Sequence, residues 1–243
     1  MAPQRIVSLV PSLTELLFWL GVGHRVVGRT KFCTEPAGEV ERVPAFGGTK
    51  DPQVSRIIAL QPDLVIANKE ENRQEDVEAL ESAGLRVLLT DPNTIPETLK
   101  MIFVIGEQVG ATGMAQTLAF EVALSAAASH RPRKIRACVV VWHNPLMVLG
   151  GESYGTAILQ SCNVENVFAN RPRYPSATLD EIRAAAPQLI LLPNEPFPFD
   201  ESHARLYGEI APTRVIDGKL LWWYGPRIPD SLHELSELLA EYR

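Results

Sequence analysis

Five residues near the middle of the chain have the types and spacing of a nucleophilic site. Residues 151–155 read Gly-Glu-Ser-Tyr-Gly and fit the pattern G-x-S-x-G, with Ser153 at its centre. In α/β-hydrolases this pentapeptide is a strained turn from strand to helix that exposes the serine, and an acid and a histidine follow it. The pairs available here are Asp200 with His203 and Asp217 with His233. Glycine and serine are also common in loops, so the alternative is a turn that caps the next helix.

We expect the motif to form a turn that caps the next helix, and we expect no catalytic residue. A hydrolase places this motif inside one continuous sheet, whereas here it comes soon after a long helical segment. Two further patterns are equally weak. Residues 47–50, Gly-Gly-Thr-Lys, lack the order G-K-[ST] of a phosphate loop. The five histidines are scattered and do not pair at i, i+4 with a second ligand, as zinc sites do, so we expect no metal site. His143 differs from the others because it follows a core strand that ends at Trp142, where ligands meet α/β sheets.

Aromatic residues in irregular segments give a stronger signal. Such residues are harder to explain as core than aromatics on regular helices. Together they suggest a flat, largely apolar ligand held by stacking, although each ring alone could simply pack beneath its loop. The set is Phe32, Phe46, Trp142, Tyr174, Trp222, Trp223 and Tyr224.

The composition limits the possible partners and the compartment. The chain has 243 residues, 46% hydrophobic and 21% charged, enough for one large domain or two lobes. Its net charge of −6 and its short basic runs argue against nucleic acid and anionic membranes as partners. Three cysteines without metal spacing predict buried thiols. We find no span of membrane length and no secretory signal, so we expect either a cytoplasmic protein or a mature chain with an added Met.

The elements that must position these residues alternate between strand and helix. This alternation predicts parallel sheets covered on both faces. The expected strands are 5–9, 26–28, 62–67, 85–90, 135–142, a short one near 167, 189–192 and 213–216. The expected helices are 11–15 onward with a capping box, 51–60, 74–83, 156–162, 179–185 and 231–242.

A long helical pattern separates the two halves. Thr94 to Glu97 has the form of a capping box, and apolar residues at helical spacing continue to His130, where Pro132 ends the pattern. One continuous helix would be about 50 Å long, and Gly110 and Gly113 could kink it or divide it. We read this segment as a strut, which gives an N-terminal α/β lobe (1–93), a backbone helix (94–131) and a C-terminal α/β lobe (132–243).

Two segments repeat each other across this strut. Residues 55–67 and 180–192 align without a gap, each as a short helix, a proline turn and a buried strand. A chance match of two common units is the alternative. Two similar lobes on one strut would form a cleft, and clefts are where ligands usually bind.

The same segments resemble a known family. The residues that carry the likeness are 5–15, Val27-Gly28, Cys33, Pro36, Gly47-Gly48, 60–67, 166–168, the Pro187 unit and 225–227. They resemble ABC-importer solute-binding proteins with a helical backbone, the TroA-like class of cobalamin and iron-siderophore receptors. This resemblance implies two Rossmann-like lobes with parallel sheets joined by a single long backbone helix, which is a class III periplasmic binding protein. It also implies a periplasmic or extracytoplasmic location.

The resemblance assigns the aromatics to a ligand site and two residues to docking. In cobalamin receptors of the family, rings from both lobes sandwich the corrin, and here they fall near Phe32, Phe46, Tyr174 and the 222–224 segment. Asn68 stands where the family has another aromatic. The family docks on its permease through one carboxylate on each lobe, at positions that correspond to Asp180 and Ser55, so one partner of the pair is missing.

We therefore expect a monomeric solute-binding protein with no intrinsic cofactor and no catalytic activity. Its ligand is expected to be a corrinoid or another metal chelate, taken up in the cleft for an ABC importer. The alternatives are a ferric siderophore or haem. Basic residues in suitable loops could hold an anionic siderophore: Arg29, Lys31, Lys50, Arg173 and Arg227. A haem iron could be ligated by His143 or Tyr174.

Overall fold

The computed structural model describes residues 2–242, which divide into two compact units. Unit 1 contains the residues up to Asp91, Thr98–Phe120 and Tyr224–Pro226. Unit 2 contains Pro92–Glu97, Glu121–Trp223 and the residues from Arg227 on. The boundaries predicted after residues 93 and 131 are not tested by this division and remain a prediction.

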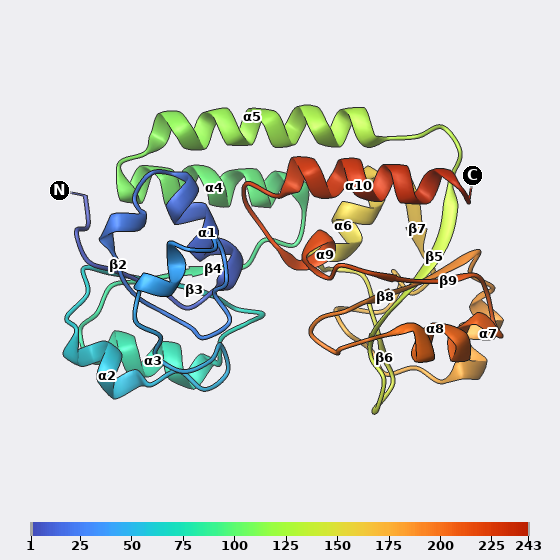
Figure 1. Cartoon of the computed structure of the whole chain (residues 1–243), viewed down its shortest axis with the longest axis horizontal. Coiled ribbons are helices and arrows are strands. Elements are labelled where there is room, and N and C mark those ends of the chain that lie inside the picture. Colours follow the sequence, from blue (N-terminus) through green and yellow to red (C-terminus); the bar gives the residue numbers. More distant parts are fainter. Residues whose placement is uncertain (1, 243) are drawn as a thin grey trace. The chain divides into compact units, whose positions relative to one another are not determined.

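Unit 1 is built on a four-stranded parallel sheet in the order β2-β1-β3-β4. The strands are β1 (Ile6–Ser8), β2 (Val26–Arg29), β3 (Leu64–Asn68) and β4 (Val87–Thr90). Helix α1 (Pro11–Trp19) lies on one side of this sheet, and α2 (Val54–Ala59) and α3 (Gln74–Ser82) lie on the other (Figure 1). Every residue of β1 and β3 is buried, as expected for central strands covered on both faces.

Unit 2 repeats this plan. Its parallel strands are β5 (Ile135–Trp142), β7 (Val164–Asn166), β8 (Leu189–Pro193) and β9 (Thr213–Ile216), and β6 (Met147–Val148) pairs antiparallel with β5. Helix α6 (Tyr154–Ser161) lies on one side of the sheet, and α7 (Leu179–Ala185) and α8 (Glu201–Gly208) lie on the other (Figure 1). The remaining helices are α9 (Lys219–Trp222) and α10 (Ile228–Ala240).

The two sheets share one strand order. In unit 1 the first strand lies between the second and the third, and in unit 2 β5 likewise lies between β7 and β8. The repeated segments 55–67 and 180–192 occupy corresponding places, as α2–β3 and α7–β8. The sequence repeat therefore reflects a repeated supersecondary structure.

Each sheet has one face that packs on its own helices. In unit 1, Val7 and Val65 contact Ile57 of α2 and Leu80 of α3. In unit 2, the corresponding core includes Cys138 and Ile190 on the strands, Ile182 on α7 and Tyr207 on α8. The three cysteines are buried and free, as predicted.

The segment expected as one strut contains two helices, α4 (Ile95–Val109) and α5 (Thr112–Ser129). Gly110 ends α4 with φ = 76°, a left-handed conformation that glycine adopts without steric cost. Gly106 lies against Ala115, where a β-carbon would collide, so glycine allows α4 and α5 to pack closely. The segment therefore forms two helices, the divided alternative, and each of the two has residues in both units.

The capping boxes predicted for α4 and α1 differ in outcome. At α4, Thr94 Oγ1 accepts the Glu97 N–H at 3.3 Å, and the Glu97 carboxylate accepts the Asn93 N–H at 2.8 Å. At α1 the predicted box is wrong, because Val10 is the N-cap and makes no side-chain bond. Pro11, whose missing N–H and fixed φ suit the first helical position, starts that helix.

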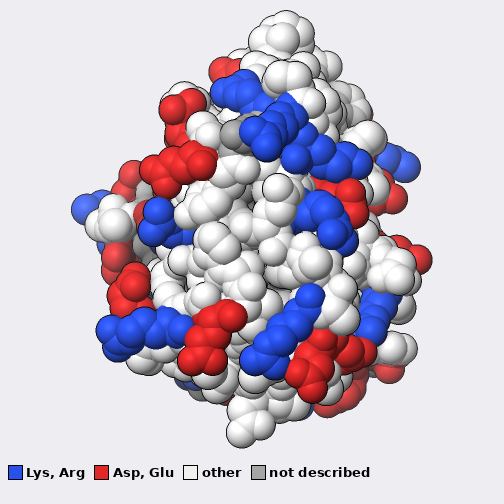
Figure 2. Space-filling model, turned by 90° about the vertical axis from the view of Figure 1, so that its right-hand side faces the viewer, with Lys and Arg blue, Asp and Glu red and all other residues white. Residues whose placement is uncertain are grey.

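Three elements of unit 2 were missed by the sequence analysis: β6, α8 and α9. In addition, α10 begins at Ile228, three residues before the expected start. Among residues 2–242, no helix has both the length and the apolar character needed to cross a membrane. On the face drawn in Figure 2, basic and acidic side chains are interspersed. Unit 2 contains ion pairs of Arg214 with Glu241 (3.2 Å) and of Arg136 with Glu165 (3.4 Å).

Candidate functional site

Strand order locates one candidate crevice in each unit. In open parallel sheets, ligands bind beyond the carboxyl ends of the strands, where neighbouring strands send their connections in opposite directions. In unit 1 this switch point lies between β1 and β3, and in unit 2 between β5 and β8. The loops that follow these four strands therefore decide the chemistry of each crevice.

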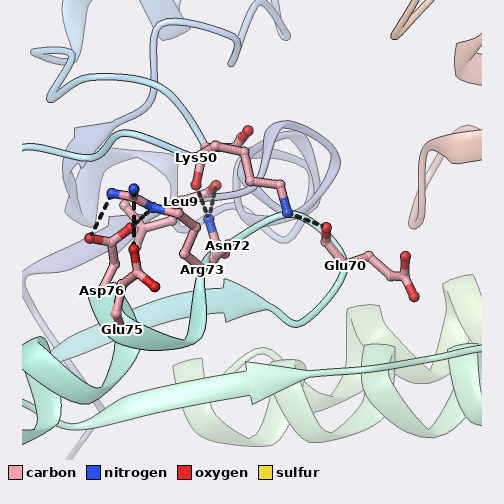
Figure 3. Close-up of polar contacts among 8 residues, drawn as sticks. Leu9, Lys50, Glu70, Asn72, Arg73, Glu75 and Asp76 are labelled. Atoms are coloured by element: carbon pink, nitrogen blue, oxygen red, sulfur yellow. Dashed lines mark hydrogen bonds and ion pairs between the residues drawn. The ribbon is translucent and has the colours of Figure 1, made fainter. Parts of the chain in front are cut away.

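In unit 1 the switch point is closed by an asparagine. Asn72 donates its amide N–H groups to the carbonyls of Leu9 (3.2 Å) and Thr49 (3.0 Å), as Figure 3 shows. Its Oδ1 accepts the main-chain N–H of Asn68 at 2.8 Å. One buried side chain thus fixes the end of β1, the end of β3 and the loop before α2.

Asn68, expected to contact the ligand, has a structural role in this loop. Its Nδ2 donates to Thr90 Oγ1 at 3.0 Å, and its Oδ1 accepts the Glu70 N–H at 2.8 Å. The residue is fully buried. Both ends of the amide are satisfied inside the protein, which explains why an asparagine can stand where the resemblance implies an aromatic ring.

A lysine and a phenylalanine lie in the loops near the switch point of unit 1. Lys50 Nζ donates to the Glu70 carbonyl at 2.7 Å (Figure 3), and partial desolvation lowers the pKa of its ammonium. Phe32 is 52% exposed, lies against Gly48 and has the Lys31 ammonium 5.2 Å from its ring centroid. Phe32 is therefore available for stacking, with cations beside it.

Phe46 has different surroundings. It is 5% exposed and packs with Val7 and Ile57 in the core of unit 1, while the Arg56 guanidinium lies 5.0 Å from its ring centroid. The absence of a side chain at Gly28 makes room for the ring. This burial supports the packing alternative for Phe46 and leaves Phe32 as the stronger ligand candidate in unit 1.

Unit 2 places an aromatic cluster at its switch point. Trp142, at the end of β5, is 37% exposed and meets Phe197, from the loop after β8, edge to face at 5.3 Å between centroids. Phe197 also lies 6.0 Å from the ring of His143 and 5.4 Å from that of His203. The crevice of unit 2 is thus lined by rings, whereas that of unit 1 is lined by amides and a lysine.

His143 is oriented from behind by a buried phenol. Its Nδ1 lies 3.0 Å from the hydroxyl of Tyr207, a fully buried residue on α8. Burial raises the pKa of Tyr207 to about 12, so the phenol keeps its proton. If the phenol donates to Nδ1, the imidazole proton lies on Nε2, and His143 presents an N–H group to any ligand.

The second tryptophan cluster centres on Glu195, in the loop after β8. Trp222 donates its indole N–H to the Glu195 carbonyl at 2.8 Å, and Trp223 donates to Glu195 Oε1 at 3.0 Å. Trp222 is half-buried, and Trp223 and Tyr224 are about 95% buried. Among these three predicted site residues, Trp222 exposes the most surface.

Tyr174, the first glycine of the G-x-S-x-G motif and the glycine before it belong to one loop structure. Gly150 and Gly151 donate N–H groups to the carbonyls of Arg173 and Arg171, each at 2.7 Å. A β-carbon on either glycine would collide with the backbone of residues 169–173. The glycines are therefore needed for this close approach, which places the half-buried Tyr174 directly after it.

Ser153 lies in the turn before α6, as the non-catalytic alternative expected, and its side chain makes no capping hydrogen bond. It is the N-cap residue of α6, is 3% exposed, and donates its hydroxyl to the Gly150 carbonyl at 2.9 Å. The proposed acid and base pair elsewhere: Asp200 Oδ1 and His203 Nδ1 are 2.7 Å apart in the capping box of α8. The Ser153 hydroxyl therefore holds the turn before α6, and His203 belongs to the capping box of α8.

The two positions expected to dock on a permease lie on exposed helix starts. Asp180 is in the first turn of α7, where its carboxylate is 91% exposed and 2.8 Å from Arg183. The neighbouring Glu181 pairs with Arg171, and that hydrogen bond lowers the pKa of the carboxyl. Ser55 is exposed in α2. Unit 1 has an exposed carboxylate in Glu75, at the start of α3. It pairs with Arg73 at 3.2 Å (Figure 3).

Sequence reasoning missed Phe197 and Tyr207, and it considered His203 only as a catalytic base. The run Pro196-Phe197-Pro198-Phe199 directly after a core strand was a usable signal, because aromatics among prolines suggest a loop with its rings packed together. Tyr207 gave no such signal, since its partner His143 is 64 residues away. Among residues 2–242, no group of three or more histidine, cysteine or acidic side chains is arranged to hold a metal ion.

Comparisons with known sequences agree with this arrangement. A family profile described as periplasmic binding protein matches residues 6–205. A vitamin B12-binding protein of Salmonella typhimurium is 33% identical over 198 residues, which cover 79% of this chain and 73% of that protein. A vitamin B12-binding protein of Vibrio parahaemolyticus is 25% identical over 251 residues, covering 98% and 89%.

Solved structures share the fold at lower identity. The periplasmic vitamin B12-binding protein of Vibrio cholerae has a TM-score of 0.85 at 18% identity, covering 99% of this chain and 98% of that one. The periplasmic haem-binding protein of Roseiflexus sp. RS-1, in its apo form, has a TM-score of 0.86 at 21% identity and covers 98% of each chain.

Proposed function

Because the chain belongs to the periplasmic binding protein family, we propose that it captures a corrinoid for an ABC importer. The observation that carries the choice of ligand is the partly exposed aromatic cluster of Trp142 and Phe197 at the switch point of unit 2. Faces of this kind suit a large planar chelate. Relatives that are named vitamin B12-binding proteins support the same ligand.

The family and the fold class agree with what the sequence predicted. The chain is a binding protein and not an enzyme, in keeping with its family, and its α/β architecture with parallel sheets is that of the solved relatives. Members of the family bind small solutes and are periplasmic. For this chain we propose an extracytoplasmic location, a monomeric state and an ABC importer permease as partner.

In this proposal each unit has its own aromatics that could stack on a ligand. Phe32 of unit 1 and Trp142, Tyr174 and Trp222 of unit 2 are the predicted aromatics that expose part of their rings. Phe46, Trp223 and Tyr224 are buried, and Asn68 is occupied within its loop. We assign ligand contact to the first set and support of the contact surface to the second.

Haem is the second candidate, because solved relatives of the same fold include periplasmic haem-binding proteins. His143 and Tyr174 are the residues that could face its iron. If Tyr207 donates to His143 Nδ1, the imidazole proton lies on Nε2, which favours a hydrogen bond to a ligand over coordination. A ferric siderophore would depend instead on Lys31 and Lys50.

The test is direct binding of cyanocobalamin. The purified protein is mixed with the corrinoid, passed through a desalting column, and its visible spectrum is recorded; haemin and a ferric catecholate are run in parallel. Retention of cyanocobalamin at equimolar ratio is the expected result. Retention of haemin alone would replace the corrinoid with haem and keep the family assignment.

A further inference from the structure

Glu195 holds two neighbouring indoles at once. Its main-chain carbonyl accepts the Trp222 N–H at 2.8 Å, and its carboxylate accepts the Trp223 N–H at 3.0 Å. Both donors are indole groups that usually need a partner when they are buried. All three residues belong to unit 2. A single residue thus determines where both rings of this tryptophan pair point.

Glu195 is itself held in place from both sides of its peptide. Gly218 lies against its backbone and Cγ, so closely that a β-carbon at Gly218 would collide with them. The preceding Asn194 accepts the Gly218 N–H through Oδ1 at 2.9 Å and donates its own N–H to the Ile216 carbonyl at 2.9 Å. The loop after β8 is therefore fixed to the end of β9, directly before the tryptophans.

The two rings differ in what they contact. The Trp223 ring has the Lys219 ammonium 4.8 Å from its centroid and the Arg227 guanidinium at 5.2 Å, and it is 6% exposed. The Trp222 ring packs on Gly155 of α6 and keeps part of its surface exposed. Trp223 therefore serves as a buried support, and Trp222 is the ring that can meet a ligand.

We propose that Glu195 is a positioning residue that sets the orientation of the Trp222–Trp223 pair and so the affinity for a planar ligand. This rests on the proposed function in its last step only, since the orientation exists without ligand. The groups that face the Glu195 carboxylate are Trp223, Asp217, Lys219 and Arg227. Burial raises the pKa of Glu195 despite the two cations, and protonation of the carboxylate weakens the acceptor for the Trp223 N–H.

The experiment compares Glu195→Ala and Glu195→Gln in the full chain, with Glu209→Ala as an exposed control on the same unit. Glutamine keeps an oxygen acceptor for the indole, and alanine removes it. Tryptophan emission of the ligand-free protein is recorded across pH 4–8, and cyanocobalamin affinity is measured by calorimetry. Because Trp19 and Trp142 are unchanged, difference spectra report on the pair.

We expect Glu195→Ala to shift the emission at neutral pH and to weaken cyanocobalamin binding about fivefold or more, since a buried indole donor loses its acceptor. Glu195→Gln should restore both at neutral pH and should lack the emission transition that the wild type shows above pH 4.5, the ordinary value for glutamate. Glu209→Ala should match the wild type.

Unchanged emission and affinity in Glu195→Ala would overturn the proposal. So would equal losses in Glu195→Ala and Glu195→Gln, since these would point to the charge and not to the hydrogen bond. If the wild type binds neither cyanocobalamin nor haemin, the proposed function fails. The emission data then still decide whether Glu195 orients the indoles.

Discussion

His143 Nδ1 and the Tyr207 hydroxyl lie 3.0 Å apart, and the phenol is fully buried while the imidazole is partly exposed. A buried hydroxyl whose proton has no acceptor is costly, so the arrangement favours donation from Tyr207 to His143. The imidazole then carries its own proton on Nε2 and faces the crevice of unit 2 as a donor.

The first prediction follows from this tautomer. We expect His143→Ala to leave the visible spectrum of bound aquocobalamin unchanged while it lowers affinity several-fold, because a hydrogen bond is lost and no metal ligand is. Spectra of the protein-bound corrinoid and a titration measure the two effects. A spectral change on removal of His143 would instead show that the imidazole coordinates cobalt. Tyr207→Phe serves as the control that keeps the imidazole.

Phe32 and Phe46 give a matched pair for the second prediction. Phe32→Ala should weaken corrinoid binding roughly 5- to 150-fold, the equivalent of about 1–3 kcal/mol for a stacked ring, and leave the melting temperature nearly unchanged. Phe46→Ala should lower the free energy of unfolding by about 3–5 kcal/mol, because its ring is in the core. Ligand titration and chemical unfolding of both variants measure the contrast. Equal losses of affinity in the two variants would mean that Phe46 also contacts the ligand.

A third prediction concerns Ser153. The Gly150 carbonyl that accepts its hydroxyl also accepts from Thr156 at 2.7 Å, so Ser153→Ala leaves that carbonyl satisfied. The expected loss of stability is at most about 1 kcal/mol, and corrinoid binding is unchanged. Thr156→Val should cost more, because that hydroxyl also accepts from Asn166 at 2.8 Å. If the wild type hydrolysed p-nitrophenyl esters and Ser153→Ala did not, the serine-hydrolase interpretation would be supported.

Docking on an importer supplies the fourth prediction. Loss of one partner of an interfacial ion pair typically costs about 2–5 kcal/mol, so docking with Ser55 in place of a carboxylate should be weak. Ser55→Glu should strengthen stimulation of a vitamin B12 importer reconstituted in vesicles, and Asp180→Ala should abolish it. Glu201→Ala, at the exposed start of α8, is the control. Strong stimulation by the wild type that Ser55→Glu does not change would exclude the role of this position, and Glu75→Ala would then be the next variant.

The fifth prediction concerns the dependence of stability on pH. A carboxyl group whose pKa is raised in the folded state stabilises the protein below its ordinary pKa of 4.5, and that contribution is lost as pH rises through the folded pKa. We expect the wild type to lose melting temperature relative to Glu195→Gln between pH 4.5 and neutrality. Calorimetric scans over this range measure the difference. Parallel curves would mean that Glu195 titrates at its ordinary pKa.

Local patterns in the sequence predicted most of the strands and helices. Runs such as 135–142 and 189–192 are apolar and bounded by breakers, and they form β5 and β8. The division of the 94–130 segment depended on Gly110, whose left-handed conformation is only one of those available to glycine. The short helix α9 carries little periodicity, so packing of Leu220 and Leu221 determines it more than propensity does.

The candidate site was harder to predict because its partners are distant in sequence. An aromatic in a loop has the same local pattern whether it faces a ligand, as Phe32 can, or fills a core, as Phe46 does. Glu195 and Trp223 are 28 residues apart, and no spacing rule connects a glutamate after one strand to an indole after the next. Residue types indicated a planar ligand, and the tertiary contacts decide which rings can reach it.

The composition of unit 1 has a consequence for synthesis of the protein on the ribosome. Tyr224–Pro226 belong to unit 1, although they come after almost all of unit 2, and Gly225 lies against Leu16 of α1. Domains generally fold as units during translation, the N-terminal one first. Here the first unit reaches its full set of contacts only when the end of the chain emerges, so the nascent N-terminal half exposes part of α1 for most of the time that translation takes.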